Sequence, residues 1–332
     1  MKKQVLLSLI LAGSMVTVAA HAEEQAQNQN ANTSSVKVSD VQNKDEKQSD
    51  LDAEITNARM RAEAGSKSKW SVKANLAYQG GSIEKPIDKE RPNYRKGTTG
   101  QALTYLTGTV GVAYRATDKD AIRLGTGITM LTPFHNNTDD LKSNKLGDDP
   151  ETKVLNVSTP YIEYSRSFRT GNIMHMPSVT YSHATEQYDV DVLQSVGSIS
   201  LDHTMVADIE GSNFQPGIAI SGGYSLYKDG AQSFDMMETR GARSDYDIGL
   251  YPFLEYSFND TFSFRTVFGY FAWSHYRSED AATFERLVSY QSMGIGISLT
   301  REIYLYPNVQ FIPDDIRSDR TNIGLSSTLN VF

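Results

Sequence analysis

From Trp70 onward, apolar side chains recur at every second position of the chain. The first run carries five of them: Trp70, Val72, Ala74, Leu76 and Tyr78. Because successive side chains of a strand point to opposite faces, this spacing predicts a strand with one apolar and one polar face. The alternation returns in later runs, at 122–130, 218–226, 248–258, 262–270, 293–299 and 323–331. The pattern therefore predicts a chain built almost entirely of strands.

The connections between these runs alternate between short and long. The short ones are 116–120, 169–172, 228–231, 259–260 and 300–302. The long ones are 80–100, 135–153, 184–213, 240–244, 278–283 and 313–320. Outer-membrane barrels have this asymmetry, with tight periplasmic turns and longer external loops. We therefore expect an all-β fold, a closed antiparallel transmembrane β-barrel of about 12 strands over residues 70–332.

Closure follows if the apolar faces contact hydrocarbon, because lipid cannot satisfy the hydrogen-bonding groups of an open sheet edge. Membrane barrels also carry aromatic girdles at both interfaces. Aromatic residues near the ends of the runs fit such girdles: Tyr78, Tyr114, Tyr256, Phe258 and Phe262. If the apolar positions face lipid, the polar positions between them face an enclosed lumen.

The chain ends in Thr328-Leu329-Asn330-Val331-Phe332. A terminal Phe after an alternating strand resembles the C-terminal signature of bacterial, porin-like outer-membrane β-barrel proteins. That resemblance implies recognition by the barrel-assembly machinery. Phe332 departs from the signature because it falls on the face of Asn330 and not on that of Val331. The runs 65–70 and 80–86 are similar to segments in outer-membrane proteins of predatory, Bdellovibrio-like bacteria, which implies nothing about chemistry.

Two segments precede the strands. Residues 1–22 have Lys2 and Lys3, an apolar core and an Ala20-His21-Ala22 end, which predicts an exported protein with a signal peptide cleaved after Ala22. Residues 23–69 form a polar, low-complexity periplasmic arm that we expect to be mostly disordered. A short helix near 50–64 is expected, with a capping box at 49–52 and Gly65 to stop it. It would be either a linker helix or a lid or tether near the barrel mouth.

The composition limits the kinds of ligand and partner that the chain is expected to bind. The chain has no cysteine, which excludes disulfides and cysteine-ligated metals. Loss of Lys2 and Lys3 with the leader takes the net charge from −8 to −10, and such an acidic chain is not expected to bind nucleic acid. The expected partners are outer-membrane lipid and lipopolysaccharide, with the monomer favoured, and the expected location is the cell outer membrane.

The alternation of inward and outward positions along the strands (their parity) predicts which charged residues face the lumen. Lys73 points inward from the first strand. Arg115 and Arg123 point inward beside one turn, where pairing could place them opposite each other, and Glu163 can neutralise them if Pro160 marks a bulge. Keeping the apolar residues of the 259–260 hairpin on one face pairs Phe258 with Phe262. That register sets Glu255 opposite Arg265 and predicts an ion pair inside the barrel.

The leading interpretation is a passive, porin-like narrow channel for small solutes or ions, lined by these six residues. It is favoured by small residues that would leave room in the lumen: Gly125, Gly127, Gly217, Ser221, Gly223, Gly294, Gly296 and Ser298. The alternative is a structural or surface-interaction barrel whose charges fill a closed lumen and whose loops bind a partner. The apolar 184–213 segment would form a constriction, cover the barrel or extend a hairpin outside it.

Catalysis and cofactors have little support in the sequence. Ser182-His183 and Ser274-His275 put a hydroxyl beside an imidazole, but adjacent strand residues face opposite ways. An outer-membrane lipid hydrolase or protease is therefore the third alternative, and no catalytic residue is assigned. The acidic loop at 138–149 lacks EF-hand spacing, so no metal and no cofactor is expected.

Overall fold

The computed structural model describes residues 55–92, 102–135, 155–228, 244–276, 283–287 and 289–331. Its only described α-helix is α3, Ala58–Glu63, and a π-helical turn, η1, covers Tyr188–Val192. The strands of the first half are β1 Trp70–Ser82, β2 Glu90–Arg91, β3 Ala102–Leu103, β4 Tyr105–Arg115, β5 Asp120–Leu131, β6 Leu155–Arg166, β7 Phe168–Thr170, β8 Ile173–His183 and β9 Ser195–Ala207. Those of the second half are β10 Phe214–Tyr227, β11 Ser244–Ser257, β12 Phe262–Gly269, β13 Phe271–Tyr276, β14 Thr283–Arg286, β15 Tyr290–Ser298, β16 Ile303–Phe311 and β17 Asn322–Val331.

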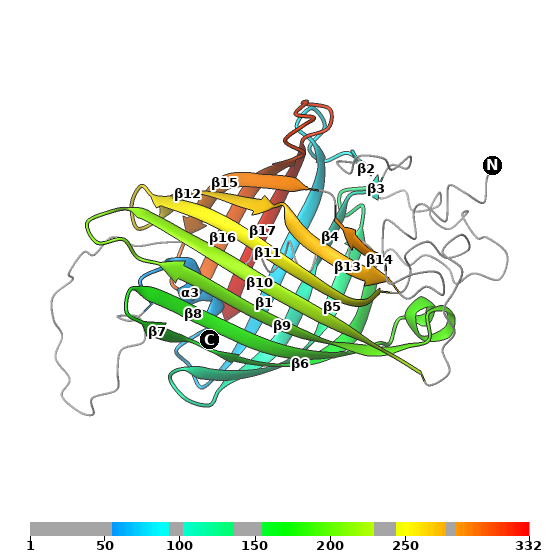
Figure 1. Cartoon of the computed structure of the whole chain (residues 1–332), viewed down its shortest axis with the longest axis horizontal. Helices are drawn as coiled ribbons and strands as arrows, with labels where there is room; N and C mark the ends of the chain where they lie inside the picture. Colours follow the sequence, from blue (N-terminus) through cyan, green and yellow to red (C-terminus); the bar gives the residue numbers. More distant parts are fainter. Residues whose placement is uncertain are drawn as a thin grey trace.

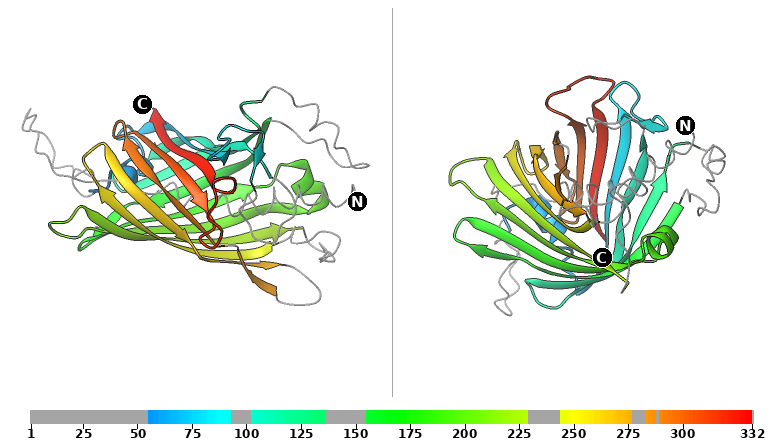
Figure 2. Two further views of the ribbon diagram at one scale, coloured as in Figure 1. Left: turned by 90° about the horizontal axis from the view of Figure 1, so that it is seen from above. Right: turned by 45° about the vertical axis from the view of Figure 1, so that its right-hand side comes forward.

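The strands close into one antiparallel barrel. Neighbours in sequence pair around the ring, β1 pairs with β17 across the ends of the chain, and β10 pairs with β11 to complete the circle. A span is here one crossing of the barrel wall. Three spans are each made of two consecutive strands with a break between them: β6 with β7, β12 with β13, and β14 with β15. The result is a closed barrel of 12 spans, seen obliquely in the right-hand view of Figure 2. The fold prediction is confirmed.

The two faces of the wall differ as the alternation predicts. Leu124, Val157 and Leu201 point outward and are 57–60% exposed. Their neighbours Arg123 and Asp202 are buried on the inner face. Outward apolar and inward polar side chains are the arrangement of a barrel whose outer solvent is hydrocarbon.

Aromatic side chains gather at both ends of the outer face. At one end the Trp70 and Tyr114 rings lie 4.7 Å apart, as do those of Phe214 and Tyr256. At the other end Tyr78 meets Phe134 edge to face, with ring centres 5.1 Å apart. These pairs form the two expected girdles.

The two rims of the barrel differ in their connections. The short-turn rim carries the turns 116–119, 171–172, 208–213, 258–261 and 299–302, and the opposite loop rim carries the other connections. Two predictions about the loops were wrong. Residues 184–213 are not one loop, because they contain the full strand β9. The connection after β10, predicted as a short turn at 228–231, does not lie at the short-turn rim. It begins at the loop rim, since Tyr224 pairs with Tyr246 there, and residues 229–243 lie outside the described part.

The helix α3 lies inside the barrel, close to the short-turn rim (Figure 1). Asn57 caps it by accepting a hydrogen bond from Met60 N at 3.0 Å, and Gly65 ends it with a φ of +85°. The helix is therefore shorter than the expected 50–64 and begins after Ile55. Residues 49–52 fall outside the described part. Within that part, no helix is long and apolar enough to cross a membrane.

Candidate functional site: the plugged end of the lumen

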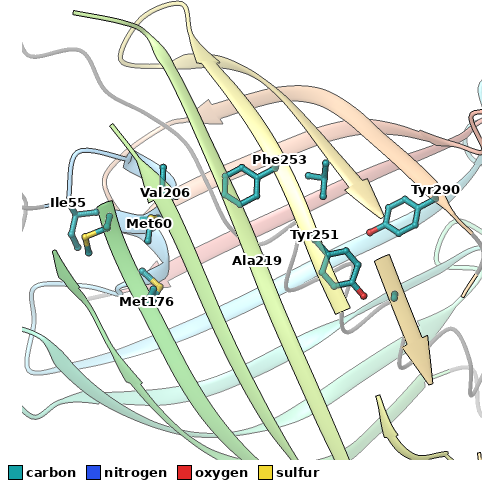
Figure 3. Close-up of a cluster of buried hydrophobic side chains, with 11 residues drawn as sticks. Ile55, Met60, Met176, Val206, Ala219, Tyr251, Phe253 and Tyr290 are labelled. Carbon is teal, nitrogen blue, oxygen red and sulfur yellow. The ribbon is translucent and has the colours of Figure 1, made fainter. Parts of the chain in front are cut away.

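Residues 55–66, here called the plug segment, fill the short-turn end of the barrel. The side chains of Ile55, Asn57, Arg59, Met60 and Ala62 are fully buried. Ile55 and Met60 pack against apolar side chains of the wall, among them Met176 and Val206, as Figure 3 shows. The arm is therefore part of the barrel interior here, neither a free linker helix nor a lid outside the mouth.

An ion pair ties the helix to the first strand. Lys73 Nζ donates to Glu63 Oε2 at 2.8 Å and to the Glu63 carbonyl at 2.7 Å. The second oxygen of Glu63 accepts from Thr328 Oγ1 at 2.6 Å. Burial raises the pKa of Glu63, but Lys73 and Arg59 outweigh it and hold that pKa below its usual value. Glu63 is therefore an ionised anchor between β1 and β17.

Further hydrogen bonds spread around the ring. Asn330 Nδ2 donates to the Ala62 carbonyl at 2.7 Å. On the far wall Asn57 Nδ2 donates to Gln215 Oε1 at 3.0 Å and to Glu255 Oε2 at 3.3 Å. The plug segment is thus bound to β10, β11 and β17 as well as β1, mainly through polar groups.

Two arginines hold the end of the plug segment. Arg115 donates from Nη2 to the carbonyls of residues 64–66, at 2.5 Å for Ser66. Arg301 donates to the Gly65 carbonyl at 2.6 Å. Carbonyl groups past a helix end lack intrahelical donors, and these guanidinium groups supply them. The expectation that Arg115 lies opposite Arg123 was wrong: Arg115 pairs with Ala121, and Arg123 with Ala113.

The predicted Glu255–Arg265 ion pair is present. The two residues are direct cross-strand partners of β11 and β12, with Arg265 Nε 2.9 Å from Glu255 Oε1 and both side chains fully buried. The Arg265 guanidinium also lies over Phe253 and Tyr306, at 5.5 and 4.9 Å from their ring centres. A charge enclosed by rings and paired in this way has a fixed orientation in the lumen.

Arg123 and Glu163 form a second inward pair, from neighbouring strands β5 and β6. The expected change of parity occurs beside Pro160: the register shifts between Thr126 and Gly127, and Thr159 has a φ of +56°. This β-bulge turns Glu163 to the inner face while Val157 remains outward. The structure thus brings together the acids and bases that parity predicted, although their role in lining a pore stays a prediction.

The inner wall has two chemically different sides. An apolar cluster runs along β8–β13 and up to Tyr290, as Figure 3 shows. Buried amide and hydroxyl groups line β1, β16 and β17: Asn75, Gln79, Asn308, Gln310, Asn322, Thr328 and Asn330. These polar residues alternate with outward apolar ones, so parity alone indicates that Thr328 and Asn330 face the lumen. Parity does not indicate that they contact the plug segment, and the sequence-based prediction missed them.

The inward glycines do not leave the expected open space. A side-chain carbon on Gly217 would lie 2.1 Å from the Phe253 ring, and one on Gly125 would lie 2.7 Å from the Tyr161 hydroxyl. Large side chains from neighbouring strands thus cover these positions, so their close approach requires glycine there. The prediction of room at these two positions was wrong.

The histidines that follow Ser182 and Ser274 contact aromatic side chains and not those serines. His183 Nδ1 lies 3.3 Å from the Tyr181 hydroxyl, and the His275 ring stacks on Tyr246 at 4.6 Å. Ser274 is buried on the inner face, opposite to His275. Within the described ranges, no three His, Cys, Asp or Glu side chains gather as metal ligands. The acidic 138–149 loop lies outside those ranges.

The sequence matches no protein-family model and no curated protein. Among solved structures, it is similar to an outer-membrane channel from Pseudomonas putida F1, with 12% identity and a TM-score of 0.44 over 81% of this chain and 97% of that one. It is also similar to the NanC porin, with 9% identity and a TM-score of 0.39 over 79% and 98% of the two chains. Outer-membrane phospholipase A from Escherichia coli has 10% identity and a TM-score of 0.36 over 78% and 90%. Because these identities and TM-scores are low, the function has to be inferred from the geometry of this chain.

Proposed function

We propose that this chain is a porin-like channel for small solutes or ions whose short-turn end is closed by its own plug segment. One observation carries the proposal: a barrel with an apolar outside and a charged, polar inside encloses residues 55–66 of the same chain. A water-filled path needs a polar lining, and a segment that closes one end of the lumen by replaceable polar contacts fits such a path. The charged residues that would line this path are Lys73, Arg115, Arg123, Glu163, Glu255 and Arg265.

The contacts of the plug segment suit reversible closure. Lys73, Thr328, Asn330, Arg115 and Arg301 hold it by hydrogen bonds that water can replace when the segment leaves. The strand ladder does not depend on it, because every span of the barrel pairs with two neighbouring spans. The segment can therefore move without opening the wall.

A disulfide provides a reversible test. The chain has no cysteine, so Ala62→Cys with Asn330→Cys introduces a single possible bridge, where Asn330 Nδ2 now contacts the Ala62 carbonyl at 2.7 Å. We expect stepwise single-channel currents in planar bilayers from the reduced protein and none from the oxidised protein. The single variants Ala62→Cys and Asn330→Cys should conduct in both conditions. Equal conductance of the double variant in both redox states would refute closure by this segment.

The closed structural barrel is the second candidate, because covered glycines and the plug segment both fill the lumen. In that case the loops would carry the function by binding a partner at the cell surface. Well-inserted protein that stays silent even after deletion of residues 23–64 would favour this candidate over the channel. Neither candidate assigns a catalytic residue, so we propose that the protein is not an enzyme.

We also propose the outer membrane as its location, reached by Sec-type export with cleavage after Ala22 and insertion by the barrel-assembly machinery. Lipid and lipopolysaccharide would then contact the outward apolar face, with one chain per barrel. Membrane fractionation of the producing cells and N-terminal sequencing of the mature chain test these points. A mature chain that begins at Met1 or remains in the periplasm would contradict them.

A further inference from the structure

The charges around the plug segment do not balance. Arg59, Arg265 and Lys73 lie in the buried region where α3 meets the wall, with Glu255 and Glu63 as the acids. Glu255 is bound by Arg265, and Glu63 by Lys73. Among these five groups, one positive charge, that of Arg59, has no acid of its own.

Arg59 is enclosed, and no described residue accepts a hydrogen bond from it. Its side chain is 0% exposed, and its Nε, Nη1 and Nη2 atoms have no hydrogen-bond partner within the described part of the chain. A guanidinium group stays protonated in proteins, so its donors need acceptors when they leave water. Burial, and after it Arg265, lowers the pKa of Arg59 well below the usual value, while Glu63, Tyr304 and Glu255 oppose that shift. The surroundings as described therefore disfavour the charge and would favour an added negative one.

Two hydroxyl groups nearby also lack partners. Tyr304 Oη and Ser263 Oγ are buried without a hydrogen-bond partner in the described ranges. Both lie over the same glycine: a side-chain carbon on Gly296 would lie 2.5 Å from Tyr304 Oη and 2.4 Å from Ser263 Oγ. Tyr304 packs against Ala62 of the same helix as Arg59, and it interacts electrostatically with Arg59. Buried donors thus gather here, with one excess positive charge and both nearby acids already engaged.

We propose that this cluster binds a small monovalent anion, held by the Arg59 guanidinium and the Tyr304 and Ser263 hydroxyls. The ligand would be either a halide or the carboxylate end of a solute, since both accept such donors. The tight enclosure of the three Arg59 nitrogens selects a small ion. Bound there, the anion is the counter-ion of Arg59 and stabilises the plug segment inside the barrel. The site concerns the plugged state alone and does not require that the barrel conducts.

Thermal unfolding of the purified full chain in detergent tests the site. Sodium isethionate, a sulfonate, is replaced by sodium chloride, or by sodium acetate in a second arm, at constant ionic strength. We expect the unfolding midpoint to rise with the logarithm of the anion concentration, by about 3 °C for each tenfold increase above the dissociation constant. A rise with chloride identifies a halide site, and a rise with acetate alone identifies a carboxylate site.

Variants assign the effect to Arg59. Arg59→Met should abolish the anion dependence, and Tyr304→Phe should raise the half-saturating concentration about fivefold, the value of one neutral hydrogen bond. Arg61→Met is the matched control on the same helix and should keep the dependence, since Arg61 donates to the Thr56 carbonyl instead. If Arg59→Met fails to fold, titrations of the wild type, Tyr304→Phe and Arg61→Met still test whether the anion binds at this cluster.

Two results would overturn the proposal. The first is a wild-type midpoint that responds to neither anion. The second is a response that persists in Arg59→Met. The proposed channel is tested by a different measurement. Absence of all conductance in a protein whose unfolding midpoint still responds to the anion would contradict the channel and not the anion site.

Discussion

Removing Glu255 should destabilise the barrel more than removing its partner Arg265. Both side chains are fully buried, 2.9 Å apart, and Glu255 also accepts from Asn57 and interacts electrostatically with Arg59. Glu255→Gln therefore leaves two arginines in one enclosed site. Breaking a buried pair in this way costs about 3–5 kcal/mol. Arg265→Met leaves Glu255 with Asn57 and Arg59 beside it, so we expect about 1–3 kcal/mol, the cost of a buried group that loses one partner.

The assay is denaturant unfolding of barrels folded in vesicles, followed by the fluorescence of Trp70 and Trp273. Arg166→Met is the control, because the Arg166–Asp120 pair is half exposed on the Arg166 side and should contribute only about 0–1 kcal/mol. The double variant Glu255→Gln/Arg265→Met should cost less than the two single changes together. If Arg265→Met proves as costly as Glu255→Gln, Arg59 does not take part in this charge cluster and the reasoning fails.

Other expected outcomes depend on single contacts. Lys73→Met removes the anchor of Glu63 and should raise the open probability in planar bilayers at least about tenfold. Lys69→Met is the control and should not raise it, because Lys69 lies on the exposed rim over Tyr114. Equal currents from the two variants would show that the plug segment does not close the channel. Leu201→Arg places a charge on the lipid face and should cost about 2–4 kcal/mol of folding free energy in vesicles. Asn213→Arg, at an exposed position of a short turn, is the control and should cost little. Burial, with Glu186 beside it, raises the pKa of Asp189 to about 6, so the 184–194 loop should lose stability as the pH rises from about 4 to about 6. Hydrogen exchange should show that loss, and Asp189→Asn should remove it; a loop equally protected across this range would contradict the assignment.

The Glu255–Arg265 pair shows what the sequence alone can determine. A tight turn fixes the pairing of Phe258 with Phe262, and the alternation then places every side chain of that hairpin on one face or the other. Arg123 and Glu163 required one further step, the bulge that Pro160 indicates. In each case local rules of turn and pleat were sufficient, because neighbouring strands in a barrel are neighbours in sequence.

The plug segment could not be predicted by the same rules. Its position depends on contacts between residues more than 150 positions apart, such as Asn57 with Gln215 and Ala62 with Asn330. The strand β9 was missed for a different reason. Its outward face is interrupted by His203, whose ring lies 5.3 Å from that of His175, and inward Val206 breaks the polar face. The covered glycines were misjudged because a residue pattern shows which way a side chain points but not which neighbour leans over it.

The charge pairs of the lumen belong to two classes with different consequences. Arg123–Glu163 and Arg265–Glu255 join wall to wall, so they remain whether the plug segment is present or not. Lys73–Glu63 joins wall to plug, and Arg115 and Arg301 donate to plug carbonyls. Departure of the segment would remove the acid from Lys73 and the acceptors from both arginines, which leaves the short-turn mouth positively charged and attractive to anions. The residues that hold the channel closed would therefore also set the charge preference of its open state.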